Sequence, residues 1–229
     1  MKNVLDKTPE MQRRVVEKYN KSGVKLYQMK GEVRHGEFID LFWCMNGAGS
    51  EKLDALKVEK QLDHDVVLFL DIDCIPLGVE AIDYYLEEAA AGKLIGNVQR
   101  SNHIENDEHL FVAPSALAIS RETYIKIGKP LAQETKRSDV AEEYTWAAES
   151  AGVPVELIMP MFFDKAPYKY NWEKDQRPFW ALKEGMPTYG IGTTFGNQKL
   201  GNLFYHNFQI FHPGNQEMFW DKCERELNG

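Results

Sequence analysis

The chain has 229 residues, of which 43% are hydrophobic and 27% are charged, and its formal net charge is -8 at pH 7. This length is typical of one large domain, and the composition excludes disordered, collagen-like and low-complexity chains. The negative charge argues against a protein that mainly coats nucleic acid or an anionic membrane, because its long-range field repels polyanions.

Neither a membrane span nor a disulfide framework is indicated. The longest strongly apolar run, Val66–Leu70, is far shorter than the roughly 20 residues of a membrane-spanning helix, and residues 1–6 lack the apolar core of a signal peptide. The three cysteines, Cys44, Cys74 and Cys223, are widely spaced and include no Cys-x-x-Cys pair. We therefore expect a soluble protein of a reducing, cytoplasmic compartment.

The predicted elements alternate between helices and strands over the first 160 residues. Thr8-Pro9-Glu10 before apolar residues at helical spacing predicts an opening helix that stops at Gly23. Further helices are predicted at 37–45, 50–62, 79–90, 139–151 and 216–227, and strands at 24–29, 66–70, 94–98, 111–119, 153–159 and 204–211. This order favours an α/β fold, a mostly parallel mixed sheet flanked by helices. We expect one domain over 1–229, with a long loop region at 160–202, which is rich in proline, glycine and aromatic residues.

Two carboxylates directly follow the apolar strand 66–70. Asp71 and Asp73 are two residues apart, so extended backbone places them on one face. The carboxyl ends of strands border the ligand crevice in open α/β sheets, and carboxylates there suit Mg²⁺ or Mn²⁺ shared with substrate phosphates. The alternative is that the two aspartates belong to an ordinary solvated turn, and the apolar strand predicted before them disfavours it.

An apolar strand that runs into Asp71-Ile72-Asp73 in mid-chain resembles the DxD motif of nucleotide-sugar glycosyltransferases with the GT-A fold, over about residues 24–220. The resemblance implies a Rossmann-like sheet, a nucleotide-sugar donor that is UDP-linked by prevalence in the family, and Mn²⁺ or Mg²⁺ as cofactor. It also implies that Asp71 contacts the donor ribose or the metal and that Asp73 binds the metal, which neutralises the diphosphate leaving group.

The acidic segment 137–144, ahead of an alanine-rich helix, resembles the helix start that supplies the base in inverting members of this family. Asp139, Glu142 and Glu143 are therefore candidate catalytic residues, one of which would deprotonate the acceptor hydroxyl. The spacing Asp139-x-x-Glu142 is also that of a helix capping box, in which the helix dipole favours both acids.

The late segment 204–214 contains two histidines and resembles the His-x-Gly of metal-dependent family members. The resemblance implies that His212 or His206 completes the protein ligands of the metal. Because side chains alternate between faces along a strand, we expect His206 to pack among apolar neighbours and His212, at the end of the strand, to bind the metal.

The remaining candidates serve the donor and the acceptor. In the family, a lysine that contacts the diphosphate usually stands before the late tryptophan. No lysine stands before Trp220, and Lys199 is the candidate for this contact. The glycine-rich run 189–196 lacks the flanking strand and helix of a dinucleotide fingerprint, and is either a loop that closes over the donor or a plain turn cluster. Trp172 and Trp180, interleaved with cations, are acceptor-side candidates because such rings stack on sugars or bases.

The leading hypothesis is a metal-dependent, hexosyltransferase-like glycosyltransferase that transfers a sugar from a nucleotide-sugar donor to a hydroxyl acceptor. Only residues 3–5 precede the first predicted helix, where family members carry a strand that leads to the nucleotide base. Either the chain is a compact member, of the kind that viruses and mobile elements carry, or residues 3–8 alone contact the base. The acceptor is a glycan, a lipid, a protein or a modified DNA base.

Two alternatives belong to other classes. A phosphohydrolase of the haloacid-dehalogenase type would use Asp71 as nucleophile, but it expects the motif near the chain start and a late acidic pair after a glycine. A catalytically silent sugar-binding module would keep the aromatic residues without needing paired carboxylates.

Overall fold

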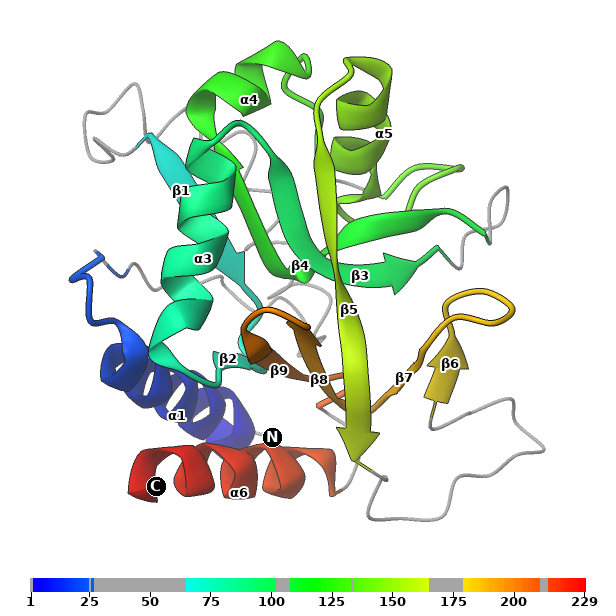
Figure 1. Ribbon diagram of the computed structural model, residues 1–229. Helices are drawn as coiled ribbons and strands as arrows, with labels where there is room; N and C mark the ends of the chain where they lie inside the picture. The colour runs from blue at the N-terminus through cyan, green and yellow to red at the C-terminus, as the bar shows by residue number, and fades with distance from the viewer. Residues whose placement is uncertain are drawn as a thin grey trace. The chain divides into compact units, whose positions relative to one another are not determined.

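The structure is a computed structural model that describes residues 2–24, 26, 65–101, 108–132, 134–164, 179–210 and 214–229 (Figure 1). The chain falls into two compact units, each described here by itself. Unit 1 spans residues 1–24, 72–83 and 158–229, and unit 2 spans residues 25–71 and 84–157. The predicted helices 37–45 and 50–62 lie outside the described residues, as does the predicted strand 24–29 apart from residues 24 and 26. The single domain over 1–229 stays a prediction.

Unit 2 contains an antiparallel sheet with helices packed against it. The sheet has the strand order β1 (Val66–Leu70), β4 (Leu110–Ser120), β3 (Leu94–Arg100), followed by the first residues of β5 (Val155–Asp164). The helices are α4 (Arg121–Lys126), α5 (Glu142–Ser150) and most of α3 (Val79–Ala90). In the register, Val66 lies opposite Ser120 and Leu70 opposite Ala116.

The core of unit 2 forms where α4 and α5 cover the sheet. Apolar side chains from β3, β4 and both helices make one buried cluster, which includes Leu94, Val112, Leu117, Tyr124, Tyr144 and Ala148. Nearly every side chain of β4 is buried, which explains its continuous apolar sequence. The burial of Tyr144 raises the pKa of its phenol.

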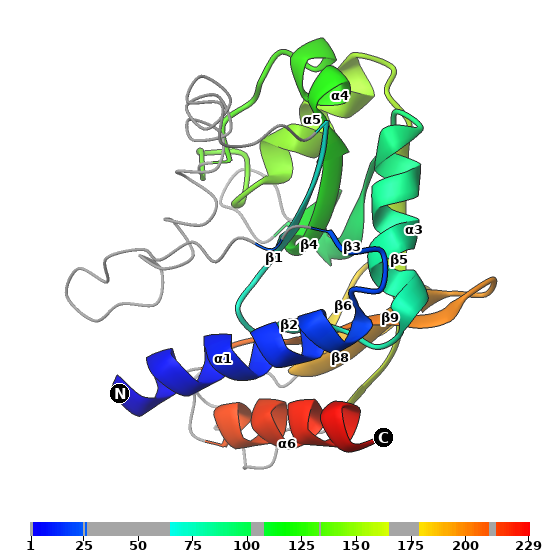
Figure 2. The same ribbon diagram turned by 90° about the vertical axis from the view of Figure 1, so that its left-hand side faces the viewer.

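Unit 1 contains a group of antiparallel strands, a two-stranded ribbon and two long helices. The strand order is β5, β8 (Gly192–Asn197), β9 (Gly201–Asn207), β2 (Cys74–Pro76), and the ribbon pairs β6 (Phe179–Ala181) with β7 (Thr188–Gly190). Helices α1 (Lys2–Tyr19) and α6 (Asn215–Asn228) lie side by side (Figure 2). None of the described helices combines the length and the apolarity that a membrane-spanning helix needs.

The start of the first helix differs from its prediction. Helix α1 begins at Lys2, so Thr8 and Pro9 lie inside it rather than at its N-terminus. Thr8 is buried and its hydroxyl accepts a hydrogen bond from Trp220 Nε1 at 3.1 Å. The Lys7 ammonium lies 4.1 Å from the centre of the same indole ring. Thr8 therefore packs against α6 inside the helix and is not the N-cap that the local sequence predicted.

The prediction of a mostly parallel sheet is wrong. The pairs β1–β4, β3–β4, β5–β8, β8–β9, β2–β9 and β6–β7 are all antiparallel. Short connections set the direction of β3–β4 and of β8–β9, because a parallel pair needs a crossover of a dozen or more residues. Residues 101–109 between β3 and β4, and 198–200 between β8 and β9, are too few for one. The apolar run of β1 predicted a strand in the middle of the sheet that is buried on both faces. This prediction is also wrong, because β1 is at the edge of the described sheet and its side chains are only half-buried.

The prediction of a long loop over 160–202 is also wrong for the part that is described. Strand β5 extends to Asp164, and β6, β7 and β8 follow before β9 begins. The glycines of this region are packed tightly: a Cβ atom on Gly190 would lie 2.3 Å from the Phe163 ring, and one on Gly192 would lie 2.4 Å from the Tyr205 hydroxyl. The run 189–196 is therefore part of the packed sheet and not a loop that closes over a donor.

Gly190→Ala is expected to lower the free energy of unfolding by about 1–3 kcal/mol, because its Cβ atom would overlap the Phe163 ring. Urea unfolding at pH 7 measures the change. Gly78→Ala is the matched control, since the only close atom there is the mobile end of the Glu80 side chain at 3.2 Å. Equal midpoints for Gly190→Ala and wild type would show that this segment is loosely packed after all.

Candidate functional site

The Asp-Ile-Asp segment forms a turn between β1 and β2. The backbone amide of Asp71 donates to the carbonyl of Ser115 at 3.1 Å, and the carbonyl of Asp73 accepts from the amide of Asn207 at 3.0 Å. Directly after the turn, β2 pairs with β9 so that Cys74 lies opposite His206. Strand pairing thus brings an imidazole from the end of the chain to the carboxylate of Asp73.

Asp73 and His206 form a buried pair within unit 1. Their side chains are 2% and 7% exposed, and Asp73 Oδ1 lies 3.2 Å from His206 Nε2. Asp73 Oδ1 accepts no hydrogen bond from the described residues, so this contact lacks hydrogen-bond geometry. Two adjacent ligands of an octahedral Mg²⁺ or Mn²⁺, each about 2.1 Å from the ion, lie about 3 Å apart. The spacing of the pair therefore fits two ligands that face one ion.

Asp71 precedes Asp73 by two residues and is buried in unit 2. The carboxylate of Asp73 and the imidazole of His206 leave further coordination positions for water and for substrate phosphates, as Mg²⁺ and Mn²⁺ require. The Asp73–His206 pair therefore fits the predicted cofactor.

The structure places His206 at the site, whereas His212 lies outside the described residues. The expected packing of His206 is also present, since its ring meets Phe208 edge to face at a centroid distance of 4.1 Å. Packing and ligation are compatible, because the phenyl group holds one side of the imidazole while Nε2 faces Asp73. His206 is therefore the candidate histidine ligand among the described residues.

His206→Ala is expected to weaken Mn²⁺ binding by more than about tenfold, because it removes one of the candidate ligand atoms. His212→Ala is the matched control and should bind Mn²⁺ like wild type. Calorimetric titration of each folded variant with Mn²⁺ checks both. The reverse pattern would return the ligand role to His212.

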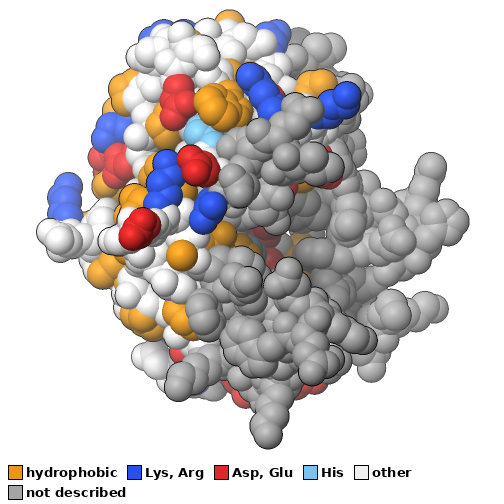
Figure 3. All heavy atoms as spheres, turned by 90° about the vertical axis from the view of Figure 1, so that its right-hand side faces the viewer, with side chains coloured by type: hydrophobic (Ala, Val, Ile, Leu, Met, Phe, Trp, Pro, Cys, Tyr) orange, Lys and Arg blue, Asp and Glu red, His pale blue; other side chains and the backbone are white. Residues whose placement is uncertain are grey.

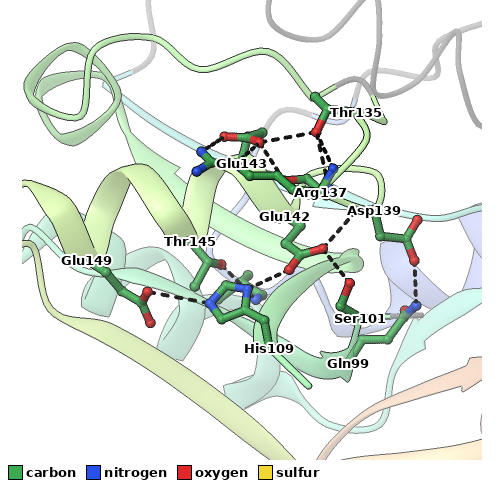
Figure 4. A network of polar contacts seen from close by, with 12 residues as sticks. Gln99, Ser101, His109, Thr135, Arg137, Asp139, Glu142, Glu143, Thr145 and Glu149 are labelled. Atoms are coloured by element: carbon green, nitrogen blue, oxygen red, sulfur yellow. Dashed lines mark hydrogen bonds and ion pairs between the residues drawn. The ribbon is translucent and has the colours of Figure 1, made fainter. Parts of the chain in front are cut away.

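The three predicted catalytic acids lie in unit 2, within one polar network (Figure 4). Glu142 is fully buried, and its Oε1 lies 2.6 Å from His109 Nδ1. Its Oε2 accepts from the Ser101 hydroxyl at 2.8 Å and from the Asp139 backbone amide at 2.7 Å. Burial raises the pKa of Glu142, but these hydrogen bonds outweigh it and the pKa is lowered overall. Glu142 is thus an ionised structural anchor, poorly suited to take up a proton near pH 7.

The capping interpretation of Asp139-x-x-Glu142 is half confirmed. The Glu142 carboxylate reaches back to the amide of Asp139, as in a capping box, whereas the Asp139 Oδ1 accepts from Val140 at 2.7 Å. Helix α5 begins at Glu142, three residues later than predicted, because Ala141 has a left-handed φ of 64°. A tight turn therefore stands where the helix was predicted to start.

Glu143 is occupied by an ion pair. Arg137 donates from Nε at 2.9 Å and from its terminal nitrogen at 2.7 Å, and Ser138 donates at 2.5 Å. The Arg137 guanidinium is the main cause of the lowered pKa of Glu143. Asp139 is half-buried, its Oδ1 accepts from the Val140 amide at 2.7 Å, and its Oδ2 accepts from Gln99 Nε2 at 3.4 Å. Asp139 is consequently the candidate base among the three acids.

The structure does not bring the other predicted residues to the Asp73–His206 pair. Lys199 is in the turn before β9, and the strand from Gly201 to His206 spans about 17 Å. Trp172 lies outside the described residues, and only the backbone of Trp180, in β6, is described. Figure 3 shows one face of the molecule. On the described part of this face, basic and acidic side chains are interspersed around a histidine, so no patch of one sign forms there.

His109 is a residue that the sequence did not indicate. It directly precedes β4, and its partners Glu142, Trp146 and Glu149 follow more than 30 residues later on α5. No local motif marks such a contact, because it depends on the packing of α5 against the sheet.

We compared the chain with protein-family models, curated proteins and solved structures, and none of them matches it.

Proposed function

We propose that the chain is a metal-dependent glycosyltransferase that transfers a sugar from a nucleoside-diphosphate sugar, UDP-linked in the first instance, to a hydroxyl acceptor. The observation that carries the proposal is the buried Asp73–His206 pair, whose ligand atoms lie 3.2 Å apart. Asp71 and Asp73 belong to an Asp-Ile-Asp sequence that resembles the family motif. The fold supports the proposal only at the level of helices packed on β-sheets.

Asp73 and His206 would hold Mn²⁺ or Mg²⁺, and Asp71 would contact the metal or the donor ribose. When bound, the metal ion neutralises the charge that develops on the diphosphate leaving group. The proposal does not include Lys199, because that lysine lies at the far end of the β8–β9 hairpin.

The proposal assigns deprotonation of the acceptor hydroxyl to Asp139. The acceptor oxygen forms a bond to the anomeric carbon, the bond from that carbon to the diphosphate oxygen breaks, and the hydroxyl proton passes to the Asp139 carboxylate. Asp139 suits this role better than its neighbours, because Glu142 is fully buried and Glu143 is paired with Arg137. A base on the acceptor and no covalent intermediate would give inversion at the anomeric carbon.

The test is release of nucleoside diphosphate from a panel of UDP-, GDP-, ADP- and dTDP-sugars in Mn²⁺, with water or simple sugars as acceptors. We expect release from at least one donor, and loss of release in EDTA. Hydrolysis of p-nitrophenyl phosphate without any sugar release would favour the phosphohydrolase with Asp71 as nucleophile. Sugar binding that is insensitive to EDTA would favour the silent binding module.

A further inference from the structure

One buried carboxylate joins three separate segments of unit 2. Glu142 contacts Ser101 at the end of β3, His109 at the start of β4, and the backbone amide of Asp139 in the turn before α5. Ser101 and His109 are also joined directly, because the Ser101 amide donates to the His109 carbonyl at 2.8 Å. The position of the Asp139 backbone thus depends on where the Glu142 carboxylate is held.

His109 is itself held by α5. Its ring stacks on the Trp146 indole with a centroid distance of 3.8 Å and an interplanar angle of 17°. Its Nδ1 faces Glu142, and its Nε2 lies 3.5 Å from Glu149. Trp146 and Glu149 follow Glu142 by four and seven residues along one helix face, so α5 fixes the ring on three sides. Figure 4 shows the contacts of His109 with Glu142 and Glu149.

The turn that carries Asp139 needs such a restraint. Ala141 adopts a left-handed φ of 64°. This conformation is unfavourable for a residue that has a Cβ atom, and it persists only where the surrounding structure enforces it. Ala141 is buried, and its amide donates to the Ala132 carbonyl at 2.9 Å. On the other side of the turn, the Glu142 carboxylate holds the Asp139 amide at 2.7 Å.

We propose that His109 and Glu142 are positioning residues, and that the bond from His109 Nδ1 to Glu142 keeps the Asp139 turn in place for its role as base. The inference rests on the proposed function for the purpose of the turn, whereas the mechanical link from His109 to Asp139 stands on the contacts alone.

The test measures the Asp139 turn without any substrate. Hydrogen exchange of the Asp139 amide, followed by NMR, reports the bond to Glu142. His109→Phe keeps a ring on Trp146 but removes the donor, and should speed exchange at Asp139 by roughly ten- to a hundredfold relative to wild type. His109→Asn keeps a donor near the Nδ1 position and should restore most of the protection. Glu122→Gln, at an exposed position on α4 outside this network, is the control and should leave it unchanged.

Trp146→Leu provides a second perturbation should His109→Phe fail to fold, because it frees the ring of His109 without altering Glu142. It should speed exchange at Asp139 in the same direction. Wild-type exchange in His109→Phe, or in Trp146→Leu where that variant carries the test, would overturn the inference. Exchange in His109→Asn as fast as in His109→Phe would also overturn it, because the donor would then have no effect.

Activity separates this inference from the proposed function. If a donor is turned over, His109→Phe should lower kcat while the KM for the nucleotide sugar stays near the wild-type value. If wild type turns over no donor but exchange at Asp139 follows the predicted pattern, the proposed function fails and the link from His109 to Asp139 stands. If wild type turns over a donor but the Asp139 amide of His109→Phe exchanges at the wild-type rate, the proposed function stands and the link from His109 to Asp139 fails.

Discussion

Asp73→Asn is expected to weaken Mn²⁺ binding by more than roughly 100-fold and to abolish turnover of nucleotide sugars. The loss of a partner that only supports a metal ligand already costs 10- to 100-fold, and Asp73 is itself the candidate ligand. The fold should survive, because the hydrogen bond between the Asp73 carbonyl and the Asn207 amide uses backbone atoms that the substitution keeps. Calorimetric titration with Mn²⁺ and thermal melting measure the two effects separately.

The control for this variant is Asp221→Asn, which removes the same charge from an exposed position on α6 in the same unit. It should bind Mn²⁺ like wild type. A folded Asp73→Asn protein with wild-type affinity for Mn²⁺ would remove Asp73 from the metal site. A variant that does not fold would show that the buried carboxylate is needed for the structure itself.

Glu142→Ala is expected to destabilise the protein by about 3–5 kcal/mol, because breaking a buried charged network leaves its partners without an acceptor. Ser101, His109 and the Asp139 amide would all lose their bonds to this carboxylate. Urea unfolding at pH 7 measures the change. Arg137→Ala breaks the neighbouring pair with Glu143, whose arginine is largely exposed, and should cost only about 0–1 kcal/mol. Equal losses in both variants would contradict the anchoring role of Glu142.

The stabilisation by Glu142 should also depend on pH. Its pKa is lowered in the folded protein, so its ionised form contributes fully above the unfolded value of about 4.3. The contribution is lost as the pH falls through the folded value. The stability difference between wild type and Glu142→Gln should therefore shrink as the pH is lowered below about 4. A difference that is constant from neutral to acidic pH would show that the charge of Glu142 contributes nothing.

Local patterns predicted single elements well. Strand β1 and helix α3 have the predicted bounds, because a continuous apolar run and helical spacing are properties of neighbouring residues. Strand direction is instead set by which strand pairs with which. The turn 198–200 makes β8 and β9 a hairpin, and the glycines that looked like loop signals at 190 and 192 are close-packing positions next to Phe163 and Tyr205.

The same distinction separates the parts of the candidate site. The spacing of Asp71 and Asp73 is local, and both residues are buried. The partner of Asp73 is not local, because the register of β2 on β9 selects His206. Alternation along the strand predicted that His206 packs against apolar neighbours, and its ring does pack on Phe208. The pairing with the facing strand decides that its Nε2 atom lies near Asp73. His109 depends on the contact between α5 and β4 and has no counterpart in any short motif.

The metal dependence of nucleotide binding tests the central claim most directly, because carboxylates repel a diphosphate unless a cation lies between them. Calorimetric titration of the full chain with UDP should give almost no heat in EDTA and a saturable binding curve in Mn²⁺. The same titration with Asp73→Asn in Mn²⁺ should resemble wild type in EDTA. Equal UDP affinity for the wild-type protein in EDTA and in Mn²⁺ would contradict the metal-bridged site formed by Asp73 and His206.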